Sequence, residues 1–350
     1  MATAVGNPLL QSPVFSNSPL PESLKAAILE NLWPLPAGLA PQQTGQFSTY
    51  FAHFEQECSP SLSSYHSIRS FGDKFTILAI MKANSTLSLT DLLTIIRATN
   101  PALAADEDKL LASIEFTVRL WLMVNVRITM PAQRHVLALC LPWPKTQSLA
   151  DVLQRITQPP ISHISTTERF SDSLNVVDMR KIANIRVLWT SDLAEHLTMR
   201  GKFLYLFSQV AVLKRIRMSG TSNNLLPPCL MDETLETLNL LIPQGNPPCN
   251  VWISKEVSRL SLDPQLQYRT TANRSTRAYS YWQGRLLDLS DAFDKTKPTG
   301  PIQWWHDRRD MGQWWNYWLV VAGITLTLLF GLIQSITGIL QVVGAGGGKN

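Results

Sequence analysis

An uncharged, apolar run of 25 residues lies near the C-terminal end of the sequence, from Leu319 to Val343. A helix rises 1.5 Å per residue, so about 20 such residues cross the roughly 30 Å hydrocarbon layer of a bilayer. A buried helix of a soluble domain rarely extends this far without a charge. We therefore predict a single transmembrane helix over residues 313–343, with a buried core helix as the alternative.

Aromatic and basic side chains gather at the N-terminal edge of this run. Such residues are enriched where a transmembrane helix meets the lipid headgroups, because their apolar parts and polar tips suit that boundary. We predict that they form a membrane interface. The residues assigned to it are Trp304, Trp305, Arg308, Arg309, Trp314, Trp315, Tyr317 and Trp318.

The flanking charges predict which side of the membrane holds the rest of the chain. Several Lys and Arg residues precede the run and only Lys349 follows it, and an excess of basic residues marks the cytoplasmic side. The N-terminal residues have neither the early positive charge nor the apolar stretch of a signal peptide. We therefore expect a single-pass protein with a cytosolic N-terminus, inserted after translation. We expect the endoplasmic reticulum rather than the mitochondrial outer membrane.

The charge distribution and the cysteines limit the classes of function. The sequence has 31 Lys and Arg against 26 Asp and Glu, but the basic residues are scattered, so we expect no nucleic-acid partner. The four cysteines have no metal-ligand spacing, which is typical of a cytosolic protein with idle thiols. A loop disulfide between Cys229 and Cys249 is conceivable only if this region were lumenal.

Helical periodicity and the positions of proline predict a mainly α-helical chain with a few short strands, an α+β class. Residues 1–20 are rich in Pro, Ser and Asn, which predicts disorder. The other expected units are a helical region at 21–141, a Pro-containing linker at 142–173, a second α-rich unit at 174–270, a juxtamembrane helix with the Trp/Arg interface at 271–312, and a Gly-rich tail at 344–350.

Residues 71–141 have the order of a winged-helix-like subdomain, which is three helices followed by two extended runs that would form a hairpin. The third helix opens with Asp106, Glu107 and Asp108 and is acidic overall. A DNA-reading helix would present Arg, Lys or Asn instead. We therefore interpret this subdomain as a contact surface for another protein.

The juxtamembrane segment, about residues 275–293, has an apolar seam with heptad-like spacing. Two heptads are too few to hold a coiled coil by themselves, so we expect this helix to dock on its own domain. The seam consists of Tyr279, Trp282, Leu286, Leu289 and Phe293.

The sequence contains no HExxH, GxSxG, P-loop or GxGxxG motif. Asp192 and His196 stand four residues apart on an expected helix, a spacing that could orient an imidazole for acid–base chemistry. A solvated surface pair is the commoner outcome, and we adopt that interpretation. We predict no catalytic residue, no cofactor and no metal, and therefore a protein that is not an enzyme.

Small and amide side chains share one face of the predicted transmembrane helix. Small residues at four-residue spacing let two helix backbones approach closely, and amides hydrogen-bond across helices. We predict that this face associates with another helix, which would allow a homo-oligomer. The residues assigned to it are Gly323, Thr327, Gly331, Gln334, Ser335 and Gly338.

The same C-terminal region carries a WW-x-DRR motif, then QWW-x-x-W and the segment FGLIQS. These motifs resemble the C-terminal anchors of a family of uncharacterised ascomycete fungal proteins. Residues 118–123 and 185–197 resemble two further segments of that family, whereas the Gly-rich end departs from its more polar tails. The resemblance implies an α-rich soluble region with a C-terminal anchor, and it implies no activity. The matching positions are Trp304, Trp305, Asp307, Arg308, Arg309, Gln313, Trp314, Trp315, Trp318, Phe330, Gly331, Gln334 and Ser335.

These features predict a tail-anchored membrane protein, with the lipid bilayer as one partner. Its cytosolic region would bind another protein, whose identity the sequence does not specify. The alternatives are an enzyme that acts at the membrane interface and a small oligomeric membrane assembly.

Overall fold

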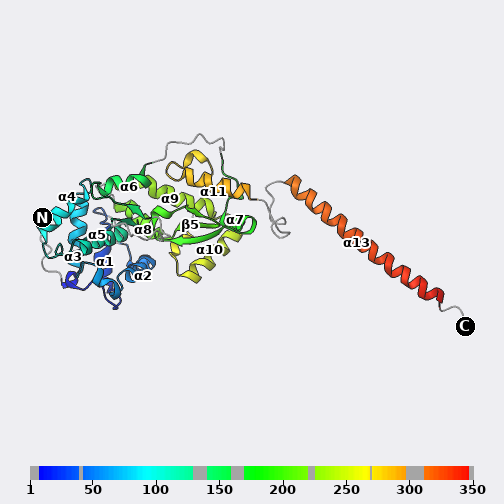
Figure 1. Ribbon diagram of the computed structural model, residues 1–350, viewed down its shortest axis with the longest axis horizontal. Coiled ribbons are helices and arrows are strands. Elements are labelled where there is room, and N and C mark those ends of the chain that lie inside the picture. The colour runs from blue at the N-terminus through cyan, green and yellow to red at the C-terminus, as the bar shows by residue number, and fades with distance from the viewer. Residues whose placement is uncertain are drawn as a thin grey trace.

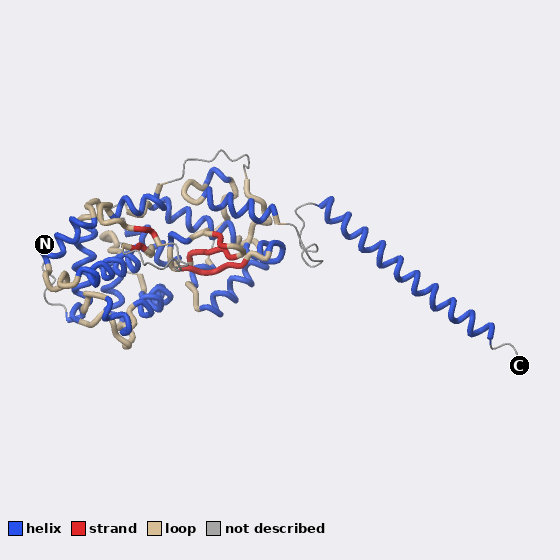
Figure 2. The backbone as a smooth tube through the Cα atoms, viewed as in Figure 1, coloured by secondary structure: helices blue, strands red, loops and turns tan. Residues whose placement is uncertain are grey.

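The computed structural model has an α+β body and one long helix, α13, that extends away from it (Figure 1). Helices dominate the body and the strands are few and short, as Figure 2 shows. The predicted fold class is therefore confirmed. The structure describes residues 8–38, 42–128, 140–158, 169–219, 225–268, 270–296 and 311–346.

The N-terminal half of the body consists of helices and one pair of very short strands. Several of its helices begin at a residue whose side chain accepts a hydrogen bond from the backbone three residues on, as with Ser70, Ser88 and Ser148. Its elements are η1 (Pro8–Gln11), α1 (Glu22–Leu32), η2 (Thr44–Phe47), α2 (Ser48–Glu57), η3 (Pro60–Tyr65), α3 (Phe71–Ala83), α4 (Leu89–Thr99), α5 (Glu107–Leu122), β1 (Val126–Arg127), β2 (Leu141–Pro142) and α6 (Leu149–Thr157).

The C-terminal half of the body combines a small sheet with helices. The elements from there to the end of the chain are α7 (Val176–Ala183), β3 (Arg186–Thr190), η4 (Leu193–Glu195), β4 (Met199–Arg200), β5 (Phe203–Phe207), α8 (Val210–Ser219), α9 (Pro228–Leu241), α10 (Pro247–Leu260), η5 (Pro264–Gln267), η6 (Thr276–Ala278), α11 (Gln283–Lys295) and α13 (Met311–Gly346).

The N-terminal segment differs from the expected disorder. Val14 is buried, its N–H donates to the carbonyl of Arg69, and Pro13 forms a bridge with Ser70. The few apolar side chains among the Pro and Ser residues are enough to pack this segment on the body. The prediction of disorder is therefore wrong for residues 8–20, and residues 1–7 lie outside the described part of the chain.

The winged-helix-like order is matched only in part. The three expected helices are present as α3, α4 and α5, but β1 pairs with β2 in a parallel arrangement. A wing is an antiparallel hairpin, and a parallel pair cannot be closed by a tight turn. The described strands therefore do not form the expected hairpin, and residues 129–139 between them lie outside the described chain.

The expected linker is part of the core over its first half. Trp143 is buried, and α6 turns Leu149, Val152, Leu153 and Ile156 inward. Residues 142–158 therefore pack against the core, because an amphipathic helix is stabilised when its apolar face is buried. They do not form a linker. Residues 159–168 lie outside the described chain.

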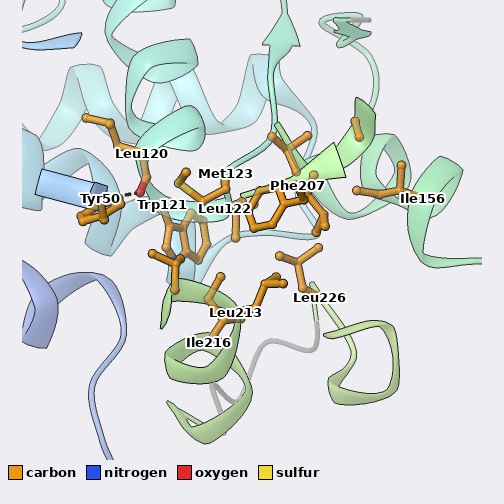
Figure 3. Close-up of a cluster of buried hydrophobic side chains, with 14 of the residues drawn as sticks. Tyr50, Leu120, Trp121, Leu122, Met123, Ile156, Phe207, Leu213, Ile216 and Leu226 are labelled. Atoms are coloured by element: carbon orange, nitrogen blue, oxygen red, sulfur yellow. Dashed lines mark hydrogen bonds between the residues drawn. The ribbon is translucent and has the colours of Figure 1, made fainter. Parts of the chain in front are cut away.

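One hydrophobic core connects the two regions that the sequence separates at residue 174. The C-terminal end of α5 lies between them, next to Phe207, Leu213 and Ile216 (Figure 3). Polar contacts reinforce the junction: Arg215 Nε donates to the carbonyl of Trp33 at 2.8 Å, and Leu193 N–H donates to the carbonyl of Met123 at 2.7 Å. The core is therefore continuous across residue 174 in the part of the chain that the structure describes.

The sheet of the C-terminal half has the order β3-β5-β4, with β3 parallel and β4 antiparallel to β5. Leu204 and Leu206 of β5 are buried, and Trp189 of β3 stacks on Trp252 of α10 at 6.0 Å between ring centroids. Side chains alternate along a strand, so the other face turns outward. On that face Phe203 is 41% exposed.

Helix α11 packs against the body rather than extending as a coiled coil. All five residues of the expected seam, from Tyr279 to Phe293, are buried. The helix itself begins at Gln283, later than expected, because η6 and a turn occupy residues 276–282. The prediction that the juxtamembrane segment docks on its own domain is confirmed.

Helix α13 has the dimensions of a membrane span. Residues Trp314–Gln341 have a mean hydropathy of 2.2, and none of this stretch is buried against the body. Its length of about 42 Å exceeds the hydrocarbon thickness of a bilayer. A core helix would be mostly buried, so that alternative is excluded, and α13 is compatible with a single-pass membrane anchor.

Candidate functional site

The aromatic part of the predicted membrane interface lies on the first turns of α13. Trp314, Trp315, Tyr317 and Trp318 contact one another, with ring centroids 5.1–6.3 Å apart. Such a cluster places apolar rings and indole N–H groups at the depth where lipid tails meet headgroups. The other assigned residues, Trp304, Trp305, Arg308 and Arg309, lie outside the described chain.

The predicted association face is continuous, because α13 is one uninterrupted helix from Met311 to Gly346. A side chain added at Gly323, Gly331 or Gly338 would meet no atom within 4 Å. Thr327 donates its hydroxyl to the carbonyl of Gly323, within its own helix. Gln334 and Ser335 are exposed on the same helix. The structure therefore brings the six residues to one side of α13, and the association stays a prediction.

Asp192 and His196 are not the solvated helical pair that the spacing suggested. Both side chains are buried, and the short 3-10 helix η4 lies between them in place of an α-helix. The carboxylate of Asp192 begins η4 by accepting the N–H of Ala194 at 2.9 Å. Burial raises the pKa of Asp192 to about 7, although N–H groups of Ala194 and Asn125 oppose the shift. The interpretation as a surface pair is therefore wrong.

His196 joins the end of β5 to helix α9. Its Nδ1 accepts the N–H of Phe207 at 3.2 Å, and its Nε2 lies 2.7 Å from Thr237 Oγ1. The Thr237 hydroxyl donates to the carbonyl of Thr234, so the Nε2 proton is the donor of the other bond. Burial, reinforced by the charge of Arg285, lowers the pKa of His196 to about 3. The imidazole is therefore a neutral structural group with both nitrogens occupied.

The start of α11 is held by a second set of contacts around this histidine. Glu233 accepts three backbone N–H groups, from Ser280, Tyr281 and Trp282, at 2.6–3.0 Å. A carboxylate is well suited to three donors, because each charge-assisted bond is stronger than a neutral one. The turn that precedes α11 is therefore fixed to α9.

Two side chains of α11 and its N-terminal turn complete these contacts. Trp282 Nε1 donates to Thr234 Oγ1 at 2.9 Å, and its ring lies edge-on to His196 at 5.0 Å. Arg285 Nη1 donates to the carbonyls of Ala194 and His196. We call His196, Glu233, Thr237, Trp282 and Arg285 the α11 joint. Its chemistry is that of a docking site, since its polar atoms bind one another.

Lys74 is a second buried titratable group. It lies on α3 with no exposed surface, and its Nζ stands 4.0 Å from the centre of the Phe54 ring and 5.4 Å from that of Phe116. Its Nζ has no hydrogen-bond partner among the described residues. Burial lowers the pKa of Lys74 to about 7. A neutral lysine amine is a nucleophile, but Lys74 has no exposed surface in this structure.

The described residues hold no grouping suited to a metal ion, because no three His, Cys, Asp or Glu side chains converge among them. Cys229 is exposed on α9, whereas Cys249 is buried on α10 beside Asn175. The loop disulfide between Cys229 and Cys249 that the sequence would allow is therefore not formed.

Sequence reasoning found α13 but missed the α11 joint. Glu233 lies 49 residues from Trp282, and Thr237 lies 41 residues from His196. No local periodicity connects such positions. The one available signal was the density of polar residues among the apolar positions of α9, where Glu233, Thr234 and Thr237 fall on its buried side.

Comparisons with known proteins give no relative for this chain: no family model, no curated protein and no solved structure matches it. The functional assignment therefore depends on the physical features above.

Proposed function

We propose that this chain is a single-pass, tail-anchored membrane protein whose body lies in the cytosol and binds another protein without catalysing a reaction. The observation that carries the proposal is the 28-residue apolar stretch of α13, Trp314–Gln341, which the body does not cover. Leaving so much apolar surface in water is unfavourable, at roughly 25 cal/mol per Å². A bilayer is the environment that removes this cost.

The buried titratable groups support a role without catalysis. A catalytic acid or base must come within hydrogen-bond reach of its substrate. Asp192, His196 and Lys74, whose pKa values burial displaces strongly, lie inside the body with at most 3% of their surface exposed. An enzyme that acts at the membrane interface remains the alternative, and it would require a reactive group outside these three.

The outward face of the sheet supports the binding of another protein. Phe203 and Leu188 are 41% and 38% exposed there, and β3 lies at the edge of the sheet. Arg186 N–H and the Thr190 carbonyl bond toward β5, so the backbone groups of the alternate residues, Val187 and Trp189, point away from it. An extended segment of a partner could pair with this edge and cover the apolar side chains.

Deleting residues 314–350 tests the anchor. We expect the truncated protein to leave the membrane fraction entirely and to keep the far-ultraviolet circular dichroism of a helical body, because α13 contributes nothing to the core. A truncated protein that stays in alkali-washed membranes would overturn the proposal.

A double variant of the sheet face tests the partner. We expect Leu188→Lys with Phe203→Lys to abolish co-purification of proteins from mild detergent, because two charges would replace the apolar contact. Leu260→Lys with Val251→Lys is the matched control, since these residues are similarly exposed on α10. Identical sets of co-purified proteins from the two double variants would contradict the assignment.

The glycines of α13 favour a second candidate, a small oligomeric assembly. Gly323, Gly331 and Gly338 leave open space along one side of a helix that would lie in lipid. An amide such as that of Gln334 is costly to desolvate unless it finds a partner there. For the membrane itself we propose the endoplasmic reticulum, and fluorescence co-localisation with markers of that organelle and of the mitochondrial outer membrane distinguishes the two.

A further inference from the structure

Three arginines line an open hollow of about 600 Å³ on the surface that leads into α11. They are Arg169, Arg274 and Arg277, and they lie on two chain segments about one hundred residues apart. The segments are joined by a bridge between Arg169 and Ser275 and by a hydrogen bond from Phe170 N to the Arg274 carbonyl at 2.9 Å. We call this hollow the arginine groove.

The floor of the arginine groove is rigid, whereas two of its arginines extend into solvent. Arg274 donates to the Ser171 carbonyl and its Nε lies 3.2 Å from Asp172 Oδ1, which leaves its side chain 14% exposed. The Arg169 side chain is 70% exposed and its Nη2 lies 3.5 Å from the same carboxylate oxygen. Arg277 is also exposed, on η6.

The charge of the groove suits a phosphate-bearing anion. Among the described residues, three arginines and no carboxylate line the groove, and the Asp172 carboxylate pairs with two of them, Arg169 and Arg274, so the groove carries an excess of positive charge. Guanidinium is the side-chain group whose planar fork matches phosphate oxygens, and it stays charged at any physiological pH. Its weak hydration also makes it easier to desolvate than a lysine ammonium.

The length of the chain between the groove and α13 allows the groove to reach the membrane that would hold α13. The groove precedes α11 by a few residues, and the α11 joint fixes that helix to the body. Residues 296–310 separate α11 from α13, and a stretch of this length reaches about 50 Å at most. The cytoplasmic leaflet of a cellular membrane is rich in anionic lipids.

We propose that the arginine groove binds the phosphate of an anionic lipid headgroup and so holds the body against the bilayer. This inference rests on the proposed anchoring by α13 with the body on the cytosolic side. It adds a second, electrostatic contact to the apolar one, and the two contacts are tested separately.

The test uses full-length protein reconstituted in vesicles of phosphatidylcholine alone or with added phosphatidylserine, and hydrogen–deuterium exchange of residues 169–175 and 270–279. We expect exchange in these segments to slow by up to about 25-fold with phosphatidylserine, since each of the two exposed arginines near an anionic surface contributes a factor of about five. High salt should remove the effect, because it screens exposed charges. Equal exchange in the two kinds of vesicle would overturn the proposal.

Arg169→Gln with Arg277→Gln should remove the protection, because both side chains are exposed and the fold does not depend on them. Arg155→Gln with Arg259→Gln is the matched control: it changes the charge equally at exposed residues outside the groove and should leave the protection intact. Loss of protection in the control would overturn the assignment to this groove.

Two further arms separate the sources of failure. Inorganic phosphate added to phosphatidylcholine vesicles should give no protection, and protection there would show that the ligand is free phosphate rather than lipid. Resistance to alkaline extraction reports the anchor alone. An inserted protein with no lipid-dependent protection would overturn the groove, whereas an extracted protein would overturn the proposed function.

Discussion

The body and helix α13 solve the problem of apolar surface in opposite ways. The body turns its large apolar side chains inward and binds its buried polar atoms to one another, as the α11 joint illustrates with His196, Glu233 and Arg285. Along α13 the same residue types face outward, and Leu326 is 59% exposed. The body therefore buries most of its own apolar side chains, whereas α13 needs an apolar environment that the chain itself does not supply.

This difference supports the proposal that the function lies at the surface of the body and on α13 rather than inside the body. The most perturbed titratable groups belong to the completed interior, where perturbed pKa values also accompany structural networks. The apolar and charged side chains that the fold leaves exposed lie on the surface, on α13, on the outward face of the sheet and in the arginine groove. We propose each of these as a contact for something outside the chain.

A pair of leucine substitutions gives the largest expected difference between the two regions. Leu289 of α11 is fully buried, so we expect Leu289→Ala to lower the free energy of unfolding of the body by about 2–5 kcal/mol, through lost burial and a cavity. Leu326→Ala on α13 should change that free energy by less than about 0.5 kcal/mol. Urea denaturation of the protein in mild detergent, followed by Trp fluorescence, measures both.

Equal effects of these two substitutions would break the comparison. A large loss from Leu326→Ala would mean that α13 packs on the body in solution. A negligible loss from Leu289→Ala would mean that α11 is not docked and that the joint does not hold it.

Two lysines of α3 sharpen the account of the body's interior. Lys74 has no hydrogen-bond partner among the described residues, so we expect Lys74→Met to stabilise the body by about 2–4 kcal/mol near pH 7. The two ring contacts of its amine offset part of the burial cost. Lys82 donates to the carbonyls of Asn31 and Leu32, so Lys82→Met should destabilise by about 1–3 kcal/mol.

The gain from Lys74→Met should depend on pH. The pKa of Lys74 falls from 10.5 in the unfolded chain to about 7 in the body, so the unfolded chain binds more protons between these values. The contribution of Lys74 to stability is therefore complete above 10.5 and is lost as the pH falls to 7. The stability gap between variant and wild type should narrow as the pH rises from 7 toward 10.5. A constant gap would show that the amine is not buried in its neutral form.

The smallest expected effect concerns contact between two copies of α13. Gly331→Ile should leave the helix inserted but keep a second helix away by steric bulk, whereas Leu332→Ala, one position further, should change little. A reduction of the crosslinked dimer by a factor of a few is expected, since helix contacts of this kind contribute about 0.6–2 kcal/mol. Equal crosslinking of wild type and both variants would leave α13 as an anchor alone.

The sequence was informative where one physical requirement acts on neighbouring residues. Membrane crossing acts on every position from 319 to 343, and helix capping acts over three residues, so α13 and α3–α5 were predicted closely. The buried seam of α11 was also predictable, because its heptad-like spacing is local. In each of these elements the residues that determine the structure are close together in the sequence.

The sequence was less informative where distant residues meet. The contacts across residue 174 were not predictable, because Arg215 binds the carbonyl of Trp33 over a separation of 182 residues. Asp192 and His196 were misplaced because a helix was expected where a short 3-10 helix leads into a strand. The arginine groove was invisible for the same reason, since Arg169 meets Arg274 only after the chain has folded.

Protease digestion of full-length protein in sealed vesicles, with the cytosolic face outward, tests the central claim most directly. The account predicts that the body is degraded, that a fragment containing Trp314–Gln341 is protected, and that detergent removes this protection. Asn273 is exposed and begins the glycosylation sequence Asn-Arg-Ser, so it would carry a glycan if the body were on the lumenal side. The account therefore predicts no glycan on Asn273. An intact body after digestion, or a glycosylated Asn273, would place the body on the opposite side of the membrane and contradict the account.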